Sequence, residues 1–165
     1  MNPRPFLLVG EAPNAATERI PRLWLRPDSS GVRHTANRLL EFSGLTQREF
    51  LEAFDRTNVL EFWPGRTRRA RAGDRWVADV ARRRVEQRRA EWQGRALVLL
   101  GRRVAGAFQL PDSLPWFSAV RLDLGEGDLG GTTAVVVPHT SGANRWFNNV
   151  ENVAAFRTYF QRMIR

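Results

Sequence analysis

The segment Thr132–Asn149 reads TTAVVVPHTSGANRWFNN, and its pattern decides the fold. Residues 134–137 form a continuous apolar run, which is typical of a strand buried on both faces. Pro138 cannot donate a backbone hydrogen bond, so the strand should end there. His139, one of 2 histidines in the chain, then enters a polar turn. Open α/β sheets bind ligands where strands end in this way, although an ordinary surface turn would show the same pattern.

Three other short apolar runs predict strands at residues 6–9, 58–62 and 96–100. Helical patterns lie between and after them, and residues 109–131 are rich in turn formers. Strands that alternate with helices are typical of a parallel sheet covered on both faces. The sequence therefore predicts an α/β fold, a three-layer α/β/α sandwich around a mainly parallel four-stranded sheet, as a single domain over residues 1–165.

The carboxyl ends of these strands carry the chemically interesting residues. Because parallel strands end at one edge of a sheet, we expect Gly10–Asn14, Trp63–Arg66 and His139–Arg145 to meet there, with Asn58 close by. A glutamate in the turn after the first strand, Glu11, can orient or deprotonate a water molecule. A plain strand–helix turn would explain the same residues.

The charge of the chain points to a nucleic-acid partner. The net charge is +9 and the isoelectric point about 11.6, and every basic residue is an arginine. Guanidinium groups suit phosphate geometry, and the arginine-rich segment Arg66–Arg75 is a candidate for phosphate contact. A GC-rich genome would explain the absence of lysine but not the net charge, and the segment is also consistent with a solvated loop.

Several classes of protein are excluded or disfavoured by composition. The absence of cysteine excludes disulfides, thiolate metal sites and cysteine-ligated iron–sulfur clusters. With no aspartate cluster either, we expect no metal and no cofactor. No apolar run approaches the ~20 residues of a membrane span, and the first ten residues are too quickly polar for a signal peptide. We therefore expect a cytoplasmic monomer that does not bind membranes.

Four short motifs together resemble the uracil-DNA glycosylase superfamily. Residues 10–13, GEAP, are similar to the first motif of its family 4 and 5 members. Residues 139–142, HTSG, followed by Asn144 and Arg145, resemble its second motif and arginine-bearing loop. Residues 57–60, TNVL, resemble the strand that carries the base-reading asparagine, and residues 99–102, LLGR, resemble the third strand and its turn. The order matches over about residues 5–160.

This resemblance implies a monofunctional, metal-independent DNA glycosylase that flips a uracil-like, deaminated or otherwise modified base and hydrolyses its N-glycosidic bond. It implies two catalytic residues: Glu11, which positions water or stabilises the sugar cation, and His139, which donates a hydrogen bond to the departing base. It implies that Asn58 reads the base and that Trp24 stacks on it. The implied base pocket also contains Ala12, Pro13 and Asn14. The implied phosphate contacts are Gly10, Ser141, Gly142, Asn144 and Arg145. The charge pattern adds Arg66 to these phosphate contacts.

The chain also departs from the family pattern. Thr140 replaces the usual proline of the second motif, and Asn14 stands where the family has a small residue. An alternative is therefore a nucleic-acid- or nucleotide-binding module on the same fold without catalysis. A small-nucleotide hydrolase is a third possibility, disfavoured because the chain has neither an aspartate cluster nor a GK[ST] phosphate-binding motif.

Overall fold

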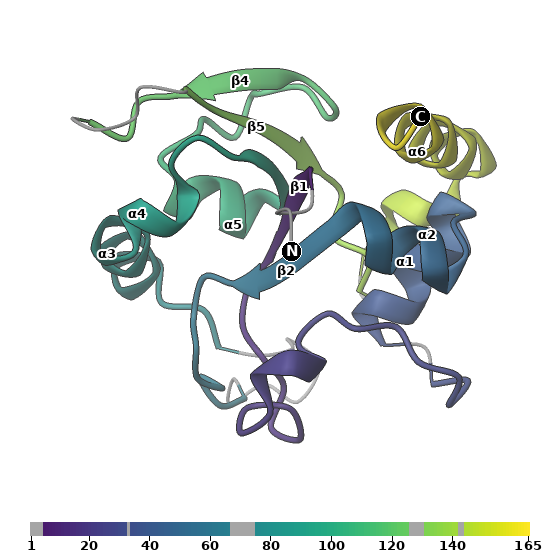
Figure 1. The fold of residues 1–165 in the computed structure, drawn as a ribbon, viewed down its shortest axis with the longest axis horizontal. Coiled ribbons are helices and arrows are strands. Elements are labelled where there is room, and N and C mark those ends of the chain that lie inside the picture. Colours follow the sequence, from purple (N-terminus) through teal and green to yellow (C-terminus); the bar gives the residue numbers. More distant parts are fainter. Residues whose placement is uncertain (1–4, 33, 67–74, 126–130, 142–143) are drawn as a thin grey trace.

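The centre of the molecule is a five-stranded sheet of order β2-β1-β3-β5-β4 (Figure 1). The computed structural model describes residues 5–32, 34–66, 75–125, 131–141 and 144–165. Four strands are parallel, and β4 pairs antiparallel with β5 at one edge. The strands are β1 (Phe6–Gly10), β2 (Phe54–Asn58), β3 (Ala96–Leu100), β4 (Ala119–Leu122) and β5 (Thr132–Val137).

Helices cover both faces of this sheet (Figure 1), which confirms the predicted α/β/α sandwich. One face carries α1 (Thr35–Ser43), α2 (Gln47–Ala53) and α6 (Val150–Met163). The other face carries α3 (Ala78–Gln87), α4 (Arg89–Trp92) and α5 (Arg102–Ala107). Two short 3-10 turns complete the described elements, η1 (Pro21–Leu23) and η2 (Arg145–Asn148). None of the helices in the described ranges has both the length and the apolar character needed to cross a bilayer.

Two apolar layers form because successive strand residues point to opposite faces. Leu7 and Leu97 pack into one layer with Trp92, which is fully buried. Leu8 and Val98 pack into the other layer, where the rings of α2 and α6 gather. A strand with both faces covered needs apolar residues at consecutive positions, and this requirement explains the unbroken apolar runs of β1, β3 and β5.

Two helix ends follow directly from the sequence. Thr46 and Glu49 form a reciprocal capping box at the start of α2, with the Thr46 backbone N–H donating to Glu49 Oε2 at 2.7 Å. Gly44 ends α1 in the left-handed conformation with φ of 69°. The first residue of α1, Thr35, lies beside the loop that follows β5.

The prediction of four strands was wrong, because β4 lies within residues 109–131, the segment described from the sequence as rich in turn formers. Among its four residues only Leu122 is buried, and Arg121 interrupts the apolar residues, so the strand shows no continuous apolar run. The position of β2 was also wrong: the strand ends at Asn58 instead of starting there. Its sequence FDRTN is mostly polar because β2 is an edge strand. The apolar residues Val59 and Leu60, which suggested a strand, are buried in the turn that follows.

The helical pattern that precedes β3 forms two helices, α3 and α4, which are divided at Arg88. The first of them, α3, begins at Ala78, three residues after the end of the arginine-rich segment Arg66–Arg75.

Candidate functional site

A cleft of about 810 Å³ lies at the carboxyl ends of the parallel strands. Glu11 after β1, Asn58 at the end of β2 and His139 after β5 all line it. Parallel pairing explains this convergence, since Gly10 is in register with Asn58 and Leu100 with Val137. The other predicted residues that line the cleft are Ala12, Pro13, Asn14, Trp24, Ser141 and Asn144.

Asn58 has an unsatisfied acceptor in this cleft. The residue is 1% exposed, and none of the described residues donates a hydrogen bond to its buried Oδ1. Leaving a buried acceptor unpaired costs about 1–3 kcal/mol, and such a group calls for an explanation. A ligand with an N–H group opposite Oδ1 would recover that cost.

Gly10 makes this position of Asn58 possible. A Cβ atom at residue 10 would lie 2.5 Å from Asn58 Oδ1 and 2.9 Å from Leu25 Cδ1. Both distances are shorter than van der Waals contact, so a larger residue would displace the amide. The structure thus places Gly10, predicted as a phosphate contact, in a buried position against Asn58.

The hydrogen bonds of His139 indicate its tautomer. The backbone N–H of Ser141 donates to His139 Nδ1 at 3.1 Å. Nδ1 is therefore an acceptor, so in the neutral ring the proton is on Nε2. Burial lowers the pKa of His139; the Glu11 charge raises it and the Arg103 charge lowers it. At neutral pH the ring is thus an uncharged donor through Nε2.

The turn after β3 allows His139 to reach this position. Gly101 has φ of 90°, and a Cβ there would lie 2.9 Å from the Cβ of His139. The backbone between β3 and α5 therefore runs directly against the histidine, and only glycine fits.

Glu11 lies beside His139 and forms an ion pair with an arginine that the sequence did not single out. Arg103 Nη1, on α5, is 3.3 Å from Glu11 Oε2. The Glu11 side chain is 23% exposed and that of Arg103 is 46% exposed, so water reaches both. The backbone C=O of Glu11 accepts a hydrogen bond from the N–H of Leu60 at 3.0 Å, which fixes the turn. The carboxylate is therefore held at the cleft wall with access to solvent.

The loop after β1 places an aromatic ring in the cleft. Trp24 is 7% exposed, and its indole Nε1 donates to the C=O of Thr17 at 2.9 Å. Asn14 Oδ1 accepts from the N–H groups of Ala16 and Thr17, both at 2.9 Å. The Asn14 side chain thus stabilises the start of this loop while lining the cleft.

Thr140 and Asn144 hold the loop that carries His139. Thr140 is fully buried; its hydroxyl donates to the C=O of Thr35 at 2.7 Å, and its C=O accepts from Arg38 Nε at 2.8 Å. Asn144 Nδ2 donates to the C=O of His139 at 2.8 Å. Thr140, which replaces the proline of the resembled motif, therefore ties the loop to the start of α1.

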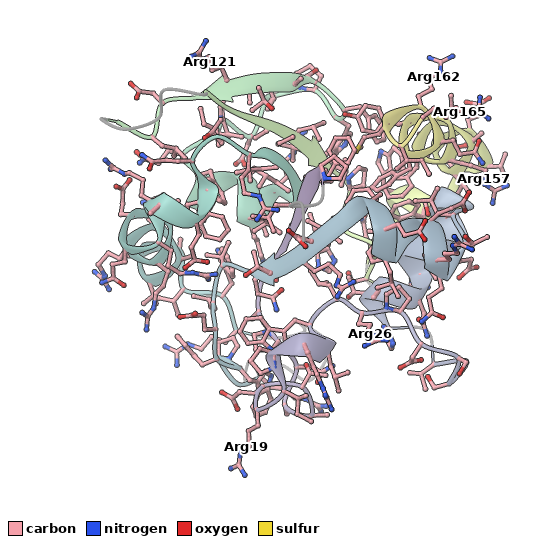
Figure 2. The ribbon with its side chains drawn as sticks, viewed as in Figure 1. Arg19, Arg26, Arg121, Arg157, Arg162 and Arg165 are labelled. Carbon is pink, nitrogen blue, oxygen red and sulfur yellow. The ribbon has the colours of Figure 1, made fainter. Side chains whose placement is uncertain are left out.

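Two further predicted phosphate contacts do not line the cleft. Arg145 and Arg66 are exposed and are not part of the cleft lining, and Gly142 lies outside the described residues. Figure 2 shows arginines projecting outward on several sides: Arg157, Arg162 and Arg165 at α6, Arg121 at β4, and Arg19 beyond η1. In the described ranges, the arginines that line the cleft are Arg26, Arg75 and Arg103. The sequence pattern did not separate these three from the other arginines.

No three His, Asp or Glu side chains in the described ranges gather closely enough to hold a metal ion. Comparison with protein-family models gives no match, and comparison with curated proteins gives none either.

Proposed function

We propose that the protein is a DNA glycosylase that binds a flipped uracil-like base in this cleft and hydrolyses its N-glycosidic bond. One observation carries the proposal: Glu11, Asn58 and His139, far apart in sequence, line a single cleft. Within it, an unsatisfied buried acceptor and a neutral histidine donor offer the complementary groups that a base edge requires.

The groups of the cleft suit a base edge in which an N–H adjoins a C=O. The N3–H of uracil would donate to Asn58 Oδ1, and its O2 would accept from His139 Nε2–H. Hypoxanthine presents N1–H and O6 in a comparable order, so deaminated purines belong to the same chemical class. Trp24 would stack on the face of the base.

Catalysis would come from stabilising charge in the transition state. As the bond between the base nitrogen and C1′ breaks, its electron pair moves onto the base and negative charge develops on O2. The His139 Nε2–H donor would stabilise that charge, and Glu11 would stabilise the positive charge on the sugar and orient the attacking water. Water then adds to C1′ and loses a proton, which Glu11 would accept.

The arginines lining the cleft support a polyanionic substrate. Arg26, Arg75 and Arg103 line the same opening as the proposed base site. A flipped nucleotide brings its flanking phosphates to the mouth of the pocket, where guanidinium groups stabilise them. This arrangement favours a base within a DNA strand over a free base.

The test is release of free base from oligonucleotides that contain uracil or hypoxanthine, with unmodified oligonucleotides as the control. The variant His139→Ala should slow release about 10²–10³-fold, the usual cost of removing one oxyanion donor. An unchanged rate would exclude the proposed role of His139. Salt-sensitive DNA binding without release of any base would instead identify a non-catalytic binding module.

A further inference from the structure

A largely buried arginine outside the cleft, Arg88, binds the end of β2 where Asn58 lies. Arg88 Nη1 donates to the C=O of Asn58 at 2.6 Å and to that of Val59 at 3.3 Å. Arg88 Nη2 donates to Thr57 Oγ1 at 2.9 Å. One guanidinium group therefore contacts three consecutive residues around the proposed base-reading side chain.

Arg88 is itself held in place. Its Nε and Nη2 donate to the two carboxylate oxygens of Glu91 at 2.9 and 2.7 Å, and this bonding lowers the pKa of Glu91. Its guanidinium lies over the ring of Trp92, 4.8 Å from the centroid, and its side chain is 10% exposed. A planar fork that donates to several acceptors at once is specific to arginine.

The division between α3 and α4 falls at this residue. Arg88 is the C-cap of α3 and the N-cap of α4, so its side chain emerges from the point where the helix is interrupted. Its partners at the end of β2 and in the turn that follows lie 29 to 31 residues earlier in the chain. This contact therefore links the helical layer to the carboxyl end of the sheet.

The contact restricts the backbone of Asn58 from the side opposite β1. On the β1 side, the Val59 N–H donates to the C=O of Gly10 at 2.9 Å. With Arg88 on the other side, the backbone that carries Asn58 is held from two directions. A loosely held Asn58 would turn so that Oδ1 meets water, and the acceptor would no longer be presented to a base.

We infer that Arg88 is a positioning residue that acts through Asn58 and maintains selection for bases with an N–H group at the recognised edge. This inference rests on the proposed function. Arg88 does not line the cleft, so it has no direct contact with substrate. Its effect on base release should therefore depend on the presence of the Asn58 amide.

A double-mutant cycle tests this dependence. Single-turnover base release is measured for Arg88→Gln, Asn58→Ala and the double variant, with Arg89→Gln as the matched control. Arg89 is the next residue and pairs with Glu86 on the helix surface, with a side chain 43% exposed. Arg88→Gln should slow release about 10–100-fold, as a misplaced recognition group does, but less than about threefold in the Asn58→Ala background.

An equal fold-loss in both backgrounds would overturn the inference, because Arg88 would then act independently of Asn58. Arg89→Gln should retain the wild-type rate, and an equal loss in that variant would also overturn it. Circular dichroism checks folding, and if Arg88→Gln fails to fold, Arg88→Lys replaces it in the same cycle, with a smaller loss expected.

Failure of the proposed function is a separate outcome. If the wild-type protein releases no base, amide hydrogen exchange still reports on Arg88. Exchange at Val59 and Leu60 should accelerate in Arg88→Gln, while exchange at Val136 in β5 should not change. Unchanged exchange at Val59 and Leu60 would overturn the positioning role.

Discussion

The substitution Gly10→Ala tests whether the recognition cleft depends on close contact between two strands. The new Cβ would lie 2.5 Å from Asn58 Oδ1 and 2.9 Å from Leu25 Cδ1. The backbone conformation of Gly10 does not require glycine, since its φ is not positive. The cost of this variant therefore arises from the contact alone.

The magnitude follows from that geometry. An ordinary contact between carbon and oxygen is about 3.3 Å or more, so Asn58 must move by roughly 0.8 Å or the strands must separate. Overpacking of this kind costs about 1–3 kcal/mol of stability. A recognition group displaced by nearly 1 Å can lose about 10²-fold in rate.

The assay combines urea unfolding with single-turnover base release. Gly106→Ala is the matched control, because a Cβ at that position of α5 meets nothing within 4 Å. Replacing glycine by alanine inside a helix should stabilise the control by about 0.5–1 kcal/mol and leave its rate unchanged. A Gly10→Ala protein with wild-type stability and rate would refute the placement of Asn58 against Gly10.

Three further predictions concern single side chains. Burial lowers the pKa of His139 below 6.5, so the neutral ring stabilises the folded protein fully above pH 6.5, and this stability is lost as the pH falls through the lowered pKa. Chemical unfolding measured from pH 7 to pH 4 should show the loss, and the variant His139→Gln should show less of it. Replacing Asn58 by Leu, of similar volume, removes the unsatisfied Oδ1 and should leave the melting temperature unchanged or higher while slowing base release; a lower melting temperature would contradict the unpaired state. Thr140→Val leaves the C=O of Thr35 without its 2.7 Å donor and should cost about 1–3 kcal/mol in urea unfolding, whereas no loss would show that the tether is dispensable.

The sequence predicted the layers of the fold well because three central strands are covered on both faces. Such strands need a continuous apolar run, which β1 and β3 carry over most of their length and β5 carries over residues 134–137. The edge strands β2 and β4 are not under this constraint, and they read FDRTN and AVRL. The prediction therefore misplaced β2 and missed β4. A run of apolar residues indicates which residues are buried. It indicates where a strand lies only if the buried residues are also the ones that pair in the sheet.

The candidate site was predictable from the sequence where its residues follow buried strands. Residues that follow buried strands, such as Glu11 and His139, were identified because their position along the chain fixes their position in space. Arg88 and Arg103 were not identified from the sequence. They lie on the helical layer formed by α3, α4 and α5, and nothing in the sequence separates them from the many other arginines of the chain. The turn-forming roles of Asn14 and Asn144 also require coordinates, because one side chain can serve a ligand or its own loop.

The strand order β2-β1-β3-β5 has a consequence for how new specificity could arise. The chain leaves β1 toward α1 and returns at β2, whereas it leaves β3 toward α5 and returns through β4 to β5. The connections that follow the neighbouring strands β1 and β3 run in opposite directions, and this arrangement is a topological switch point. A crevice opens there without the loss of any core residue. The segment that follows β1 and carries Trp24 could therefore be exchanged for one that admits a bulkier ligand while the sheet keeps its present register.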